Sequence, residues 1–104
     1  MSTTFSPASK GIKRVQATIS NTAVYLKDIS GLSTTLVNTA QSALIQVRSG
    51  EINLSHAPEA PTTSEGITIT AGQSFTLVGP NVVRNTQLIR NGGTDATVDL
   101  ILEG

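Results

Sequence analysis

The apolar residues of this chain recur at every second position, and this period of two limits the fold more than any other feature. In the segment RVQATIS, Val15, Ala17 and Ile19 alternate with polar residues. Such alternation places one face of a β-strand in a core and the other in solvent. No apolar stripe with helical spacing persists for ten residues, and threonine and β-branched residues stand where helix formers would be needed. We therefore expect strands and no helices.

Further candidate strands are AVYLKDI and TTLV, and three longer segments have the pattern of β-hairpins. The first hairpin, SALIQVRSGEINLS, turns at Ser49 and Gly50. Its predicted cross-strand pairs are Val47 with Ile52 and Ile45 with Leu54 on the buried side, and Arg48 with Glu51 and Gln46 with Asn53 outside.

The second and third hairpins follow in the C-terminal half. GITITAGQSFTLV has a three-residue loop at 71–73, which pairs Ile69 with Phe75 and Ile67 with Leu77. TQLIRNGGTDATVDLIL has a five-residue loop at 91–95, which sets Leu88 against Val98.

Eight or nine short strands with a turn signal every eight to twelve residues indicate an all-β fold. We expect a single-domain, jelly-roll-like β-sandwich of about eight antiparallel strands over residues 15–104, preceded by a polar N-terminal arm at 1–14. A domain of 104 residues without cysteine gains little stability from its core alone and none from disulfides. Oligomerisation or docking on a partner is the remaining common source of stability.

Charge and hydropathy exclude several function classes. The formal net charge is zero, which argues against a general nucleic-acid binder, and no apolar run approaches the length of about 20 residues that a membrane span requires. We expect a soluble protein made in the cytoplasm.

Residues 1–50 carry a net charge of +4 and residues 51–104 a net charge of −4. This split predicts either solvated loops or complementary surfaces between neighbouring subunits.

The stretch HAPEAPTTSEG, residues 56–66, holds the only histidine and is predicted to be the longest loop between strands. Ser64, His56 and either Glu59 or Glu65 imitate the residue types of a hydrolase triad. A lone histidine in a proline-rich loop is more often structural or exposed, so we expect a contact loop and no enzyme.

No cofactor or metal is expected. The glycine-centred turn ITAGQSF in a jelly roll resembles cupins, whose enzymes hold a metal with several histidines, whereas this chain has one. NGG at 91–93 and GP at 79–80 are predicted to be turns.

Phe5, Tyr25 and Phe75 are too few to form stacking platforms for nucleic acid, and Tyr25 is the only candidate to stack on a sugar.

Residues 43–104 resemble small β proteins encoded among the structural genes of tailed bacteriophages. The resemblance rests on Pro61-Thr62, on Ala71-Gly72 and on LIRNGGTDATVDL at 88–100. The family usually has an aspartate-glycine pair before the Pro-Thr, whereas this chain has APEA at 57–60. We therefore infer no ligand from that loop.

The resemblance implies a capsid decoration or cement protein that binds the major capsid protein and other copies of itself, as a dimer or trimer, on the virion surface. The arm would reach onto the capsid protein or a neighbouring copy. The alternatives are a head-tail connector, a tail or fibre component, a host-binding module, and a cupin-like enzyme. The candidate partner-contact residues are Lys10, Lys13, Arg14, Glu59, Glu65, Asn91 and Asp95.

Overall fold

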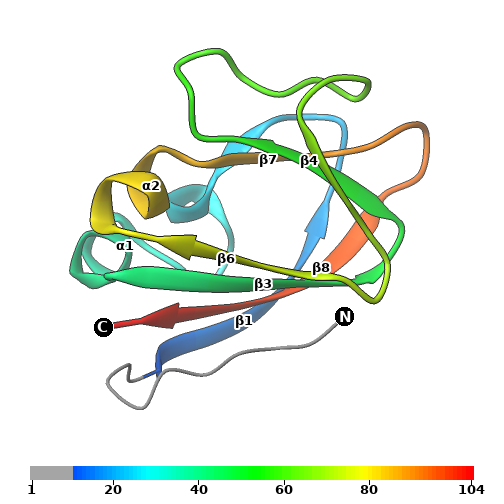
Figure 1. Cartoon of the computed structure of the whole chain (residues 1–104). Helices are drawn as coiled ribbons and strands as arrows, with labels where there is room; N and C mark the ends of the chain where they lie inside the picture. Colours follow the sequence, from blue (N-terminus) through cyan, green and yellow to red (C-terminus); the bar gives the residue numbers. More distant parts are fainter. Residues whose placement is uncertain (1–10) are drawn as a thin grey trace.

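The structure is a computed structural model that describes residues 11–104, and it is built from two four-stranded antiparallel sheets (Figure 1). The strands are β1 (Gly11–Ile19), β2 (Val24–Tyr25), β3 (Ser42–Ser49), β4 (Glu51–Ser55), β5 (Ile67–Thr70), β6 (Ser74–Val78), β7 (Gln87–Arg90) and β8 (Ala96–Glu103). Three short helices connect them: η1 (Leu26–Asp28), α1 (Thr34–Thr39) and α2 (Pro80–Asn85).

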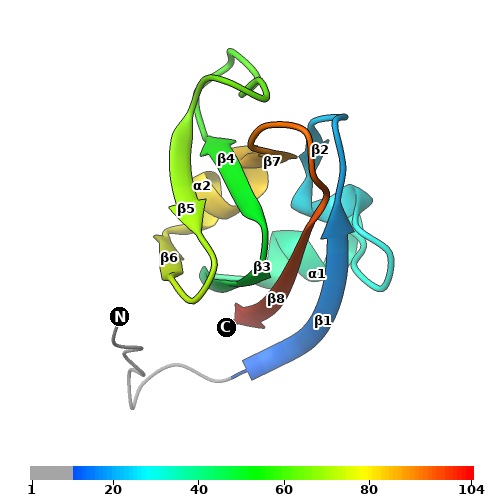
Figure 2. The ribbon, with the colours of Figure 1, turned by 90° about the vertical axis from the view of Figure 1, so that its right-hand side faces the viewer.

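The strand order is that of a jelly roll, so the expected fold class is confirmed. Sheet A has the order β1-β8-β3-β6 and sheet B the order β2-β7-β4-β5. The two sheets face each other, and the chain passes from one to the other at nearly every connection (Figures 1 and 2). Among the strands of residues 11–104, only β4 and β5 are consecutive in the chain and paired in one sheet.

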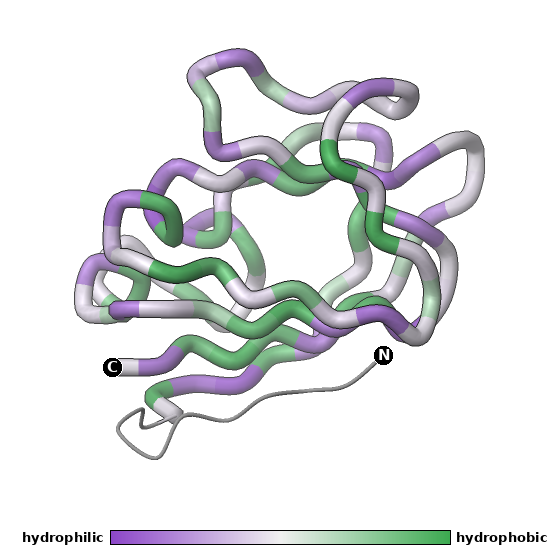
Figure 3. Tube along the Cα trace, viewed as in Figure 1, coloured by the Kyte–Doolittle hydropathy of each residue, from purple (hydrophilic) through white to green (hydrophobic). Residues whose placement is uncertain are grey.

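The core lies between the two sheets and consists of aliphatic side chains. Strand β8 shows the pattern most clearly, because Ala96, Val98, Leu100 and Leu102 have no exposed surface while the residues between them are partly exposed. Side chains of β3 in the same sheet and of β4 and β7 in the facing sheet pack with them, and the other strands and the helices add further core residues. In Figure 3 the hydrophobic segments lie mainly on the strands, and the loops are mainly hydrophilic or neutral.

The three predicted hairpins are wrong. Strands β3 and β4 belong to different sheets, as do β5 and β6, and β7 and β8. Phe75 pairs with Ile45, Leu88 pairs with Leu54, and Val98 pairs with Val47. The alternation of apolar residues is the same whether the next strand pairs through hydrogen bonds or faces the first across a core.

The predicted buried sides are mostly confirmed. Eight of the predicted inward residues of the three hairpin segments are buried: Ile45, Val47, Ile52, Leu54, Ile69, Leu77, Leu88 and Val98. Phe75 is partly buried and packs against the core. Ile67 is an exception, since it is 48% exposed at the start of the edge strand β5. Asn53, predicted to lie outside, points away from the core but is only 1% exposed, because a loop covers it.

The sequence prediction also missed the helices. TTLV belongs to helix α1, whose N-cap Ser33 accepts a hydrogen bond from the backbone N–H of Leu36. Only Val24 and Tyr25 of AVYLKDI form a strand, and η1 follows. Gly79 and Pro80 begin α2, where proline suits the first helical position. Each helix is at most six residues long, too short for a periodic stripe to reveal it.

Strand β1 begins at Gly11, so residues 11–14 of the predicted arm belong to sheet A. Lys13 pairs with Leu102 and Arg14 with Ile101. The rest of the arm, including Lys10, lies outside the described residues. Over residues 11–104, no helix combines the length and the hydropathy needed to cross a bilayer.

The turn between β3 and β4 requires a glycine at position 50. Gly50 has a φ of 72°, and an added Cβ would lie 3.0 Å from the Cα of Ala96. We expect Gly50→Ala to lower the free energy of unfolding by about 2 kcal/mol, through strain and through this backbone contact. Urea unfolding measures the change.

Gly72→Ala is the matched control for that experiment. Gly72 has a φ of 86° but open space around the Cβ position. This variant should lose only the strain, about 1 kcal/mol. Equal losses in the two variants would contradict a close approach at Gly50.

Candidate functional site

The loop between β4 and β5 is the feature that most alters the surface of the molecule. It spans residues 56–66, between Ser55 and Ile67, as predicted. The β2–β3 connection is longer, because it contains η1 and α1. In Figure 1 the 56–66 loop rises above β4 and β7 at the top of the molecule. Its C-terminal half folds back against the outer face of sheet B.

Asn53 anchors this loop. Its side-chain amide donates hydrogen bonds to the Thr62 carbonyl at 2.8 Å and to Asn91 Oδ1 at 3.2 Å. Its Oδ1 accepts a hydrogen bond from the Thr68 hydroxyl at 2.7 Å. Because the side chain is buried, each of these bonds forms away from competing water, and losing one leaves a polar group unpaired.

Local contacts fix the shape of the loop. At its start, the Ser55 hydroxyl accepts a hydrogen bond from the Ala57 backbone N–H. Pro61 is buried, and a β-bridge joins Thr62 to Glu65 near the other end. An added Cβ on Gly66 would lie 3.1 Å from Asn53 and 3.2 Å from Pro61, so the chain packs tightly where it enters β5.

The β7–β8 turn, residues 91–95, lies against the same loop. The Gly92 backbone N–H donates to the Thr63 carbonyl at 2.9 Å. The Asn91 backbone N–H donates to the Glu51 carbonyl, and the Asn91 side chain donates to Glu51 Oε2 at 3.2 Å. Loop 56–66 and turn 91–95 therefore form one continuous surface, which we call the loop surface.

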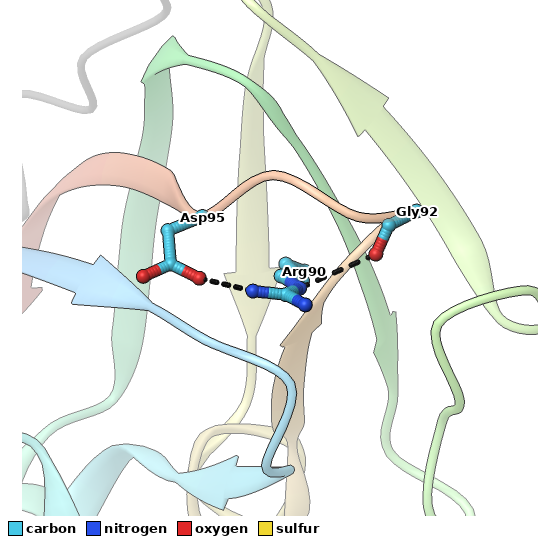
Figure 4. Close-up of polar contacts among 3 residues, drawn as sticks. All are labelled: Arg90, Gly92 and Asp95. Atoms are coloured by element: carbon cyan, nitrogen blue, oxygen red, sulfur yellow. Dashed lines mark hydrogen bonds and ion pairs between the residues drawn. The ribbon is translucent and has the colours of Figure 1, made fainter.

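Arg90 holds the turn in shape (Figure 4). Its guanidinium donates to the Gly92 carbonyl at 3.3 Å and forms an ion pair with Asp95 at 2.5 Å. The guanidinium thus spans the turn, joining its start to its end. Asp95, a predicted contact residue, uses its charge within the turn, and Asn91 is partly buried in it.

The loop surface and its border are acidic. Glu51, Glu59, Glu65 and Asp95 are exposed, and Arg90 forms an ion pair with Asp95. Glu59 and Glu65 line a shallow depression of about 290 Å³. Between residues 11 and 104, the ion pairs are Arg90–Asp95 and Arg48–Asp99, so Glu59 and Glu65 form none.

The predicted basic contact residues lie elsewhere. Lys13 and Arg14 are exposed near the start of β1 in sheet A, whereas the loop surface covers sheet B. Neither forms an ion pair with another described residue. The structure therefore brings together Glu59, Glu65, Asn91 and Asp95 and places Lys13 and Arg14 on a second surface.

The residues that imitate a hydrolase triad do not form one in this structure. His56 is exposed and lies beside Tyr25, Ala57, Pro58 and Asn85. The Ser64 hydroxyl contacts Thr62, and no hydrogen bond within residues 11–104 joins it to His56. Over the same residues, no three His, Asp or Glu side chains are grouped closely enough to hold a metal ion.

Comparisons with known proteins found no relative. The chain matches no protein-family model, no curated protein and no solved structure. The architecture and the surfaces described above are therefore the basis of the functional argument.

Sequence analysis missed the role of Asn53. Its position in the alternation is that of an outward polar residue, which in most strands faces water. The only available signal was its place two residues before a long proline-containing loop. That spacing does not show whether the loop extends into solvent or folds back on the sheet.

We expect Asn53→Ala to lower the free energy of unfolding by about 2 kcal/mol, because the Thr62 carbonyl and the Thr68 hydroxyl lose their buried partner. Hydrogen exchange at the Gly92 N–H should also accelerate, since its acceptor, the Thr63 carbonyl, lies next to Thr62. The exposed His56→Ala should change stability by less than about 0.5 kcal/mol. Unchanged exchange at Gly92 in Asn53→Ala would show that the loop is held by other contacts.

Proposed function

We propose that this chain is a capsid decoration protein, or cement protein, of a tailed bacteriophage. In this role it binds the outer surface of the head shell and bridges major capsid protein subunits. The observation that carries the proposal is the position of Lys13 and Arg14. Both are exposed on β1, an edge strand with no described strand on its free side, directly after the polar segment 1–10. An open strand edge with unpaired cations favours contact with another chain.

The separation of charge supports self-association. Lys13 and Arg14 on β1 and the acidic loop surface lie on different sheets, so they do not neutralise each other within one copy. In a closed dimer or trimer, the β1 edge of one copy can contact the loop surface of the next. Such contacts also add the stability that a small core without disulfides lacks.

The residues behind the phage resemblance support the proposal as well. Pro61-Thr62 and the segment 88–100 are distant in sequence, but they meet at the loop surface through Asn53 and through the Gly92–Thr63 hydrogen bond. Two of the three segments that carry the resemblance thus build one shared surface, and the third, Ala71-Gly72, lies in the β5–β6 turn. We place the protein on the virion exterior, after synthesis in the host cytoplasm.

The second candidate is another component of the virion: a head-tail connector, a tail or fibre component, or a host-binding module. The observation that favours it is the loop surface itself, because loops held on a rigid sandwich are a common arrangement for recognition. In that case the contact would be made at a few sites on the particle. A decoration protein instead occupies every equivalent site of the shell.

Copy number separates these two candidates. In virions produced from the genome that encodes this chain, we expect quantitative mass spectrometry to give a ratio of about one-third to one relative to the major capsid protein, as symmetric shell sites require. A value near zero would reject decoration. Six or twelve copies per particle would support a connector or fibre.

Deletion of residues 2–10 tests the N-terminal segment without removing β1. We expect the truncated domain to keep its melting temperature within a few degrees and to lose binding to heads that lack the protein. A deletion that extends to residue 14 is less informative, because it removes strand pairs with β8. Full binding by the folded truncation would contradict a role for this segment.

Charge reversal tests the proposed contact between copies. Lys13→Glu with Arg14→Glu should weaken self-association at low salt by about tenfold, measured by sedimentation. Adding Glu59→Lys and Glu65→Lys to the same chain should restore it. Failure of this second pair to restore association would exclude the loop surface as the partner of β1.

A further inference from the structure

A groove that adjoins one end of the loop surface runs between the helices and the start of the 56–66 loop. Two adjoining depressions of about 320 and 440 Å³ form it, and both are lined by Tyr25 and Asn85. The first lies against η1, α1 and α2, and the second extends to His56 and Pro58. Helices α1 and α2 are at the left in Figure 1. These volumes fall in the range of about 300–1,000 Å³ that is usual for small-molecule sites.

Tyr25 supplies an aromatic wall. It lies on the two-residue edge strand β2, where Val24 packs against the core and Tyr25 points the other way. Its side chain is among the few large hydrophobic groups left exposed, at 36%. The Lys27 ammonium lies 5.6 Å from the ring centroid, which is within cation–π range.

The charged groups that line the groove are cationic. Lys27 and Arg84 line the first depression, and among residues 11–104 no carboxylate lines either depression. Asp28, the acid nearest in sequence, lines a separate depression beside β1. Asn81 holds the Arg84 side chain in place by accepting a hydrogen bond from its guanidinium, so this charge is positioned before any ligand arrives.

The remaining polar groups suit a ligand with several hydroxyls. Thr34, Asn38 and Asn85 line the first depression and present one hydroxyl and two amides. Asn85 is oriented by a hydrogen bond from its Nδ2 to the Asn81 carbonyl, which leaves its Oδ1 to accept from a ligand. An amide can both donate to and accept from adjacent hydroxyls.

We propose that this groove binds an acidic saccharide, with a hexuronic acid unit at Tyr25. The ring of Tyr25 would pack against the apolar C–H face of the sugar. Arg84 and Lys27 would bind the sugar carboxylate through charge-assisted hydrogen bonds, and the amides of Asn38 and Asn85 would bind its hydroxyls. A simple anion such as phosphate would leave the aromatic wall and the amides unused.

The test uses the purified full-length chain without phage heads, so its outcome does not depend on whether the chain binds a shell. Trigalacturonic acid is titrated into labelled protein, and backbone NMR shifts are followed. We expect shifts confined to β2, η1, α1, α2 and residues 56–58. The trimethyl ester, which keeps the sugar rings but removes the negative charges, should bind at least about tenfold more weakly.

Variants separate stacking from charge. Tyr25→Ala should weaken binding at least about tenfold and Tyr25→Phe by less than about threefold, because the ring is kept. Arg84→Gln should weaken binding of the acid and leave the ester unaffected. Arg48→Gln, which removes an exposed cation outside the groove, is the matched control and should bind as the wild type does.

Three results would overturn the proposal. Equal binding of the acid and its ester would remove the role of the cations. Equal affinity for triglutamate or inorganic phosphate would show a general anion site. If Tyr25→Phe and Tyr25→Ala both bound with wild-type affinity, and thermal melting showed that both variants are folded, the ring would have no role in binding.

Discussion

Burial of aliphatic side chains between two facing sheets is the interaction on which the rest of this structure depends. Strands β3 and β8 lie inside sheet A, β4 and β7 lie inside sheet B, and the core side chains of all four strands are almost fully buried. Few aromatic residues contribute, so many small aliphatic contacts supply the stabilisation. The jelly-roll strand order meets the same requirement. Each time the chain crosses to the other sheet, the new strand adds apolar side chains to the face that points into the core.

The outer face of sheet B shows how one polar residue organises a surface. Without the 56–66 loop, Asn53 would be solvated like any outward residue of a strand. With the loop folded back, its three hydrogen bonds join β4, β5, the loop and the β7–β8 turn. The buried amide therefore specifies the arrangement of the loop and the turn more closely than an apolar residue would, since only one arrangement of its neighbours satisfies all of its polar atoms.

Three surfaces with different chemistry result from this architecture. The β1 edge is basic, the loop surface is acidic, and the groove at Tyr25 combines cations with an aromatic ring. The first two suit contacts between copies and with a shell, as proposed for a decoration protein. The groove lies between η1, α1, α2 and the start of the loop, and of the loop surface it includes residues 56–58. The sandwich keeps all three fixed relative to one another.

The sequence by itself determined the fold class, most inward-facing residues and the limits of the 56–66 loop. Period-two alternation encodes which side of a strand is buried, and the prolines and glycines mark where strands end. Only the tertiary structure decided which strands pair, because Val47 and Ile52 have the same pattern in a hairpin as in two facing sheets. It also decided that Asn53 is buried and that Tyr25, Lys27 and Arg84 share a groove, since packing between distant segments creates both environments and no local pattern records them.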